Sequence, residues 1–133
     1  MACMGLTGIA GLLESCSAPL QVFKLTPATG SNMVSVPLSA FTEKVIMVLI
    51  RDPDLEDDVL VVKSNGVFNA LLMTCTHESQ SLTATNRGIY CNEHGSRFDF
   101  TGKVLKEPAL DNLTRYKTES TENSVNIYLN QQI

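Results

Sequence analysis

Apolar residues along this chain occur as short runs and alternations separated by turn-forming residues, rather than at the spacing of an amphipathic helix. Residues 44–51 are rich in Val, Ile and Leu, and Asp52-Pro53-Asp54 follows them, which predicts a buried strand and then an acidic loop. Residues 34–38 alternate around Pro37, and proline in such a segment marks a strand end or an edge strand. The first part of the chain therefore predicts β-structure.

The strongest hairpin signal is the pair of apolar segments 59–63 and 67–72, which flank Ser64-Asn65-Gly66. Asn-Gly favours a tight turn whose twist matches that of paired strands. Further short strands are predicted at residues 89–90, 98–100, 103–105, 115–119 and 125–129, the last with Val125, Ile127 and Leu129 alternating inward. Several short strands with frequent turns, and no long amphipathic helix, predict an all-β sandwich or barrel.

Length and composition restrict the possible classes of protein. With 133 residues and 44% hydrophobic content, the chain is long enough for one domain with a proper core and too short for two substantial ones. Its formal net charge is −4, and no run of basic residues occurs in it. This charge balance argues against nucleic acid or an anionic membrane surface as the binding partner.

Two short clusters of potential metal ligands lie in the middle of the chain, Cys75-Thr76-His77 and Cys91-Asn92-Glu93-His94. They contain both histidines of the chain and two of its four cysteines, and thirteen residues separate them. Each follows a predicted strand, so each falls on a loop. Two such loops that face each other can hold a metal centre from both sides, and we interpret the pattern as a two-iron site.

Other interpretations of these residues remain open at this point. Zinc also binds two cysteines and two histidines in tetrahedral structural sites. Zinc fingers, however, usually place two cysteines together and then two histidines, whereas each cluster here has one of each. The cysteines and histidines could instead be structural, and a catalytic Cys–His pair would leave the second pair unexplained.

The ligand spacing, Cys-x-His and then Cys-x-x-His, resembles that of the Rieske family of iron–sulfur proteins. Residues 95–99, Gly-Ser-Arg-Phe-Asp, are similar to the segment that follows the second histidine in that family, and Pro108 falls where the family has its cover loop. The resemblance extends from about residue 34 to about residue 129. It implies stacked antiparallel sheets with a small cluster-binding subdomain at one tip.

The resemblance also implies the cofactor and the residues that hold it. In a Rieske [2Fe-2S] cluster, cysteines bind one iron and histidines bind the other, which here means Cys75 and Cys91 on one iron and His77 and His94 on the other. High-potential relatives have a serine and a tyrosine that donate hydrogen bonds to sulfur. The corresponding positions are Ser96 and Phe98, so this chain keeps the first donor only.

The function that the resemblance implies is one-electron transfer to or from a redox partner protein (a cytochrome, a reductase or an oxygenase), with no substrate turned over. Respiratory Rieske proteins have an additional cysteine in each ligand loop, and Gln80 and Glu93 occupy those positions here. This difference resembles the ferredoxin branch. The alternative is the Rieske subunit of a quinol-oxidising cytochrome bc-type respiratory complex. An oxygenase would need a separate iron site, and both histidines are already assigned.

Residues 1–19 differ from the rest of the chain. An apolar run at residues 5–13, too short to span a bilayer, leads to Leu13-Glu14-Ser15-Cys16, which resembles a bacterial lipoprotein cleavage site with Cys16 as the lipidated residue. No Lys or Arg precedes Lys24, so we expect a truncated export signal. The resulting hypothesis is an exported, periplasmic or membrane-anchored lipoprotein. The alternative is a disordered or helical tail on a cytoplasmic protein.

The predicted organisation is therefore a signal or anchor segment, or a disordered tail, at residues 1–19, followed by one Rieske domain at residues 20–133. The part of the domain that binds the cluster is predicted at about residues 71–112.

Overall fold

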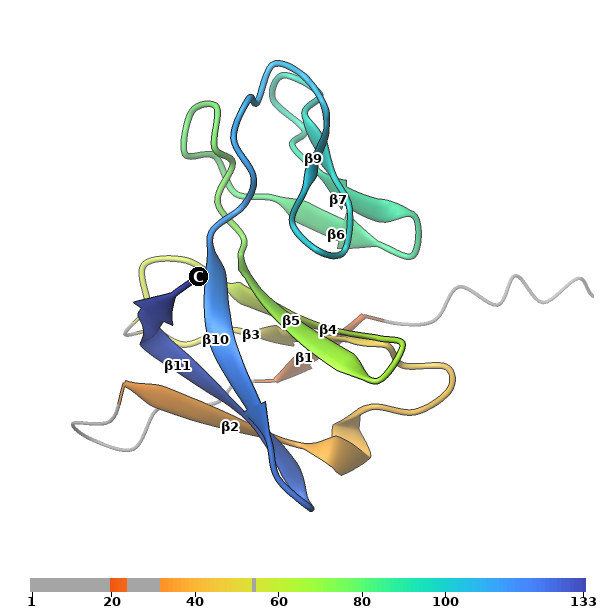
Figure 1. Cartoon of the computed structure of the whole chain (residues 1–133). Helices are drawn as coiled ribbons and strands as arrows, with labels where there is room; N and C mark the ends of the chain where they lie inside the picture. Colours follow the sequence, from red (N-terminus) through yellow and green to blue (C-terminus); the bar gives the residue numbers. More distant parts are fainter. Residues whose placement is uncertain (1–19, 24–31, 54) are drawn as a thin grey trace, which may run out of the picture.

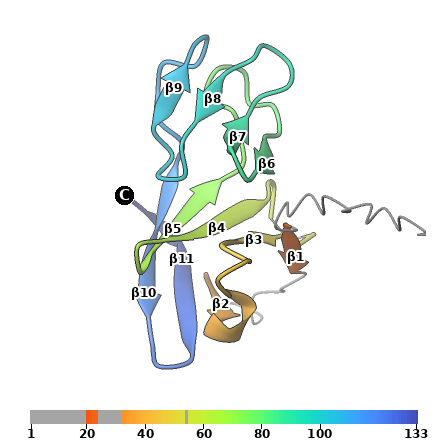
Figure 2. The ribbon, with the colours of Figure 1, turned by 90° about the vertical axis from the view of Figure 1, so that its right-hand side faces the viewer.

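The structure is a computed structural model that describes residues 20–23, 32–53 and 55–133. It is built almost entirely of β-strands, with a seven-stranded sheet as the base and a four-stranded sheet beyond one end of it (Figures 1 and 2). This arrangement confirms the predicted all-β fold. The strands are β1 (Gln21–Phe23), β2 (Met33–Pro37), β3 (Met47–Ile50), β4 (Val59–Ser64), β5 (Val67–Leu72), β6 (Thr83–Thr85), β7 (Gly88–Tyr90), β8 (Arg97–Phe98), β9 (Val104–Lys106), β10 (Arg115–Ser120) and β11 (Ser124–Gln132), and one 3-10 helix, η1, covers Leu38–Ala40.

The base sheet has the strand order β1-β3-β4-β5-β10-β11-β2, and all its neighbouring strands are antiparallel except β1 and β3. The strand β2 lies at the end of this order and contains Pro37, as the alternation around that proline predicts. The predicted strand at residues 44–51 is shorter than expected, because pairing begins only at Met47.

The predicted hairpin at Asn65-Gly66 is confirmed. Both residues have positive φ, 50° for Asn65 and 77° for Gly66, as a two-residue turn that follows strand twist requires. The turn joins β4 to β5, which are paired from Ser64 and Val67 back to Val59 and Leu72. The last predicted pair is also confirmed by β10 and β11, in which Val125 and Ile127 are fully buried.

The continuous apolar runs of β3 and β4 result from burial on both faces. One face contributes to a first core, which the base sheet encloses. This core contains Val48, Ile50, Val59 and Val61, together with residues such as Phe68, Val125 and Ile127. The other face contributes to a second core, under the four-stranded sheet. This core contains the neighbouring residues Met47, Leu49, Leu60 and Val62. Strands covered on both sides lose the polar alternation of a half-exposed strand.

The second sheet, called the small sheet below, has the strand order β6-β7-β8-β9 and is antiparallel throughout. The strand β6 was not predicted, because Thr83–Thr85 carries no clear alternation. The β8–β9 pairing is irregular: Phe98 is opposite Val104 and Arg97 is opposite Lys106, so Leu105 is the additional residue of a β-bulge. The bulge directs Lys106 to the same face as Arg97.

Gly102 lies where the small sheet meets the base. Its φ is +85°, and a Cβ atom there would lie 2.9 Å from Cδ2 of Leu71 in β5 and 3.3 Å from Cβ of Leu113. Its carbonyl accepts a hydrogen bond from the backbone N–H of Leu113, at 2.8 Å. Glycine at this position therefore allows the β8–β9 hairpin to lie directly on the base sheet.

The prediction of a cleavage site at Cys16 concerns residues outside the described part of the chain. Among the described residues, no helix is long and apolar enough to cross a bilayer.

Candidate metal centre

The first ligand loop begins three residues after β5 ends. Within it the backbone N–H of Cys75 donates to the carbonyl of Gln80 at 2.7 Å, and the N–H of Ser79 donates to the carbonyl of Cys75 at 2.9 Å. Ser79 has a φ of 53°, in the left-handed region. An isolated bridge between Thr74 and Ser81 closes the base of this loop.

The second ligand loop follows β7 and repeats the same hydrogen bonds. The N–H of Cys91 donates to the carbonyl of Ser96 at 2.9 Å, and the N–H of Gly95 donates to the carbonyl of Cys91 at 3.0 Å. Gly95 has a φ of 82°. In each loop the cysteine backbone is therefore hydrogen-bonded to the fourth and fifth residues after it. The backbone of the fourth residue is in the left-handed region.

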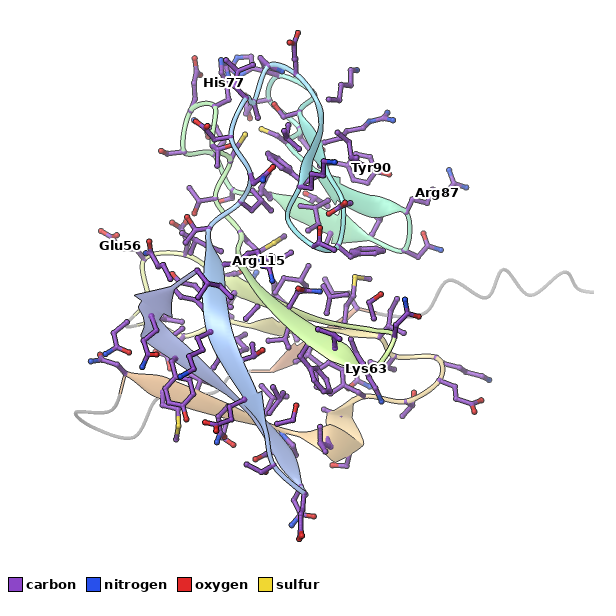
Figure 3. The ribbon with its side chains drawn as sticks, in the orientation of Figure 1. Glu56, Lys63, His77, Arg87, Tyr90 and Arg115 are labelled. Atoms are coloured by element: carbon purple, nitrogen blue, oxygen red, sulfur yellow. The ribbon has the colours of Figure 1, made fainter. Side chains whose placement is uncertain are left out.

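The two cysteines and the two histidines have different surroundings. Cys75 and Cys91 are buried, unpaired thiols that belong to the second core. His77 and His94 are exposed, and their ring centroids lie 5.1 Å apart with an interplanar angle of 89°. Figure 3 shows His77 at the end of the molecule farthest from the base sheet. The structure thus brings two imidazoles together at the surface, with thiols below in the interior.

Glu78 is a polar neighbour of the histidines that the sequence did not single out. Its Oε2 atom lies 3.6 Å from Nδ1 of His94. Among the described residues, His77, Glu78 and His94 form the only group of three or more ligand-type side chains whose donor atoms all lie within 4.8 Å of one another. Neither cysteine belongs to this group.

This spacing bears on the choice between one metal ion and two. A tetrahedral zinc ion with bonds of about 2.0–2.3 Å needs its four donor atoms within roughly 4 Å of one another. Among the described residues, the group of close ligand-type atoms contains both histidines and neither cysteine. Buried thiols and exposed imidazoles fit a centre with two metal atoms, in which one atom binds the thiols and the other binds the imidazoles.

The segment 107–111, called the Pro108 loop below, is hydrogen-bonded to both ligand loops. Oγ1 of Thr76 donates to the carbonyl of Asp111 at 2.7 Å, and Oγ of Ser96 accepts a hydrogen bond from the N–H of Ala109 at 2.9 Å. Ala109 is buried, while Leu110 is 76% exposed. The Pro108 loop thus joins the two ligand loops to each other.

Ser96 and Phe98 are both fully buried beside the second ligand loop. Because the Ser96 oxygen accepts from Ala109, its own hydroxyl proton is available for a second partner. Phe98 is opposite Ile89 in the small sheet and packs in the same core as the two cysteines.

The turn after β8 is organised by Asp99. Its Oδ1 atom accepts hydrogen bonds from the N–H and hydroxyl of Thr101, at 2.8 and 2.6 Å, and from the N–H of Lys103, at 3.0 Å. Burial raises the pKa of Asp99, but these hydrogen bonds outweigh burial and hold the pKa below its usual value. The carboxylate therefore fixes the turn that leads to Gly102.

Comparisons with known proteins agree with this fold. A model of the Rieske [2Fe-2S] domain matches residues 48–117. The cyanobacterial plasma membrane Rieske protein PetC3 from Synechocystis PCC 6803 is 29% identical, with 69% of this chain and 97% of that chain aligned at a TM-score of 0.57. The ferredoxin of carbazole 1,9a-dioxygenase from Nocardioides aromaticivorans IC177 is 21% identical, with 69% and 91% aligned at a TM-score of 0.51. No curated protein sequence matches the chain significantly.

The fold defines a small all-β protein whose candidate ligand His77 lies at one end. The chain belongs to the Rieske [2Fe-2S] domain family. Its cofactor is a [2Fe-2S] cluster, and its function is electron transfer of the Rieske type.

Proposed function

We propose that Cys75 and Cys91 bind one iron through their thiolate sulfurs, and that His77 and His94 bind the other through ring nitrogens. The observation that carries this assignment is the pair of ligand loops with matching hydrogen bonds, which bury both thiols and bring the imidazole rings to 5.1 Å. A cluster held by these four residues would supply one-electron transfer. The exposed histidines give a partner protein direct access to it.

The chain acts in this proposal as an electron carrier that serves a separate redox protein. Gln80 and Glu93, at the positions of the loop cysteines in respiratory Rieske proteins, support this role. The second candidate is a subunit of a membrane-bound quinol-oxidising complex. The similarity to a plasma membrane Rieske protein and the presence of Ser96 favour that candidate.

The experiment that tests the proposal is a metal and sulfide assay on the purified protein, together with visible and EPR spectra. We expect two irons and two acid-labile sulfides per chain and a Rieske-type EPR signal after reduction. One tightly bound zinc and no sulfide, in protein produced with sufficient iron, would overturn the assignment.

Ser96 and Phe98 are expected to set the reduction potential. A hydrogen bond to sulfur stabilises the reduced state more than the oxidised one, because reduction adds negative charge. If the difference is about 1 to 1.5 kcal/mol, a one-electron potential changes by roughly 40 to 65 mV. Ser96→Ala should lower the potential by this amount, and Phe98→Tyr should raise it similarly.

Protein-film voltammetry measures both shifts. Ser64→Ala, an exposed serine at the β4–β5 turn, is the control for Ser96→Ala and should leave the potential unchanged. If Ser96→Ala and Phe98→Tyr leave both potential and spectrum unchanged, their side chains do not interact with the cluster.

We further propose that residues 1–19 carry an export signal and that Cys16 is lipidated, so that the domain at residues 20–133 is held at a membrane. The apolar run before Cys16 and the similarity to a plasma membrane protein support this. Protein expressed in a bacterium from its native upstream region should fractionate with membranes, and Cys16→Ser should release it. Soluble cytoplasmic protein that retains Met1 would contradict the anchor.

A further inference from the structure

Two cationic residues that are nine positions apart in sequence lie together on the small sheet. Tyr90 is opposite Arg97 across β7 and β8, and Arg97 is opposite Lys106 across β8 and β9. Directly opposed residues in paired strands project from the same face. We call Arg97 and Lys106 the cationic row.

The cationic row is accessible and is not neutralised by neighbouring residues. Both side chains are exposed, and within the described part of the chain neither forms an ion pair. The Arg97 guanidinium lies 5.2 Å from the centre of the Tyr90 ring, which fixes its position without cancelling its charge. Two like charges placed directly opposite each other destabilise a sheet, so folding alone does not favour this arrangement.

The carboxylates of this half of the molecule are not at the strand positions of the cationic row. Glu78 is directed at His94, and Asp99 accepts hydrogen bonds within its own turn. The exposed Glu93 belongs to the second ligand loop, and the exposed Glu107 and Asp111 belong to the Pro108 loop, outside the strand positions that form the row. The cations therefore occur as a group on a chain whose formal net charge is −4.

The cationic row extends to the ligand loops. The Nζ atom of Lys106 lies 3.9 Å from the position of a Cβ atom on Gly95, the residue after His94. A molecule that contacts Lys106 is therefore next to the second ligand loop. Charges beside a reactive edge steer oppositely charged partners toward it.

We propose that the cationic row is the docking site for an acidic redox protein, one whose own electron-transfer centre is surrounded by carboxylates. The proposal rests on the function proposed above and adds the chemistry of the partner. Charge complementarity identifies the occupant: the row attracts an acidic surface, while the net negative charge of the rest of the chain repels a wrongly oriented approach.

The test measures how fast the reduced holoprotein gives one electron to hexacyanoferrate(III), a trianion, and to tris(phenanthroline)cobalt(III), a trication. We expect Arg97→Gln with Lys106→Gln to lower the ratio of the anion rate to the cation rate by roughly five- to twentyfold at low ionic strength. The effect should fall below about twofold at 0.5 M salt, where charges are screened. A substitution that changes the reduction potential of the protein changes both rates in the same direction, so the ratio of the two rates isolates the effect of charge.

The matched control is Lys63→Gln with Lys117→Gln. These lysines are also exposed and also lie over aromatic rings, at 6.0 Å from Phe68 and 5.4 Å from Tyr128, but they belong to the base sheet. The control pair changes the net charge equally and should leave the rate ratio within about twofold. Equal effects of the two pairs would show that only net charge matters and would overturn the proposal.

Two further probes distinguish the class of partner. Poly-L-glutamate should inhibit the hexacyanoferrate(III) reaction of the parent protein and not that of the row variant, as expected for an acidic polypeptide surface. Sedimentation with phosphatidylglycerol vesicles that depends on Arg97 and Lys106 would assign the row to lipid and overturn the proposal. Each variant must show the parent's cluster spectrum first, so loss of the cluster is not confused with loss of docking.

Discussion

His77→Ala and His94→Ala are expected to fold and yet to have no Rieske-type spectrum. Both rings are exposed and neither belongs to a core, so their removal leaves no cavity in the packed interior. Each substitution removes one of the two nitrogen ligands that we assign to the outer iron. We expect iron and sulfide contents to fall to a small fraction of the parent's, while the far-ultraviolet circular dichroism of the β-fold is retained.

Glu78→Gln is the control that separates two possible metal centres. A single ion bound by His77, Glu78 and His94, whose donor atoms lie within 4.8 Å, would lose a ligand in this variant. A cluster bound by two cysteines and two histidines would keep all its ligands. We therefore expect Glu78→Gln to retain iron, sulfide and the EPR signal. Loss of metal from Glu78→Gln with the thiols unaffected would contradict the ligand assignment.

Gly102→Ala is expected to destabilise the protein by about 2 to 5 kcal/mol. The φ of +85° is costly for any residue with a Cβ, by about 1–2 kcal/mol. The added carbon would also lie 2.9 Å from buried Leu71, and overpacking of that kind costs about 1–3 kcal/mol. The small sheet must therefore move away from the base sheet or strain the second core.

Gly66→Ala separates the two contributions. Gly66 has a similar φ of +77°, but a Cβ atom there would have no neighbour within 4 Å. Gly66→Ala should therefore lose only the backbone contribution, about 1–2 kcal/mol. Urea unfolding of the variants, followed by circular dichroism under identical conditions, gives the difference. Equal destabilisation of both variants would show that the contact with Leu71 costs nothing.

The sequence predicted those parts of the fold that depend on local chemistry. Asn65-Gly66 identified its hairpin because few other residues accept positive φ at both turn positions. The candidate ligands were recognisable because cysteine and histidine are rare in this chain and because the family resemblance assigned their spacing.

Features that depend on distant pairing were not predictable in this way. The three-residue strands β1 and β6 are too short to show a period, and their pairing partners determine them. Thr76 and Asp111 are 35 residues apart, so nothing local indicates that they hydrogen-bond. The sequence has no run of basic residues, yet strand pairing and the bulge at Leu105 gather Arg97 and Lys106 onto one face.

Burial of β3 and β4 on both faces has a consequence for how the chain finds its alignment. In a half-exposed strand, a slip of one residue exposes the apolar side chains and is rejected for that reason. Along β3 and the Val59–Val62 part of β4, such a slip would exchange one buried apolar residue for another. The interactions that select the correct alignment must therefore be made at the strand ends.

Two features at the strand ends can supply this information. The tight Asn65-Gly66 turn fixes β4 against β5. Arg51, just after β3, donates hydrogen bonds from Nε and Nη2 to the Asp58 carboxylate, just before β4, with a shortest distance of 2.6 Å. Aliphatic residues within β3 and β4 should consequently be exchangeable among Val, Ile and Leu, whereas changes at Asn65, Arg51 or Asp58 should produce misaligned molecules.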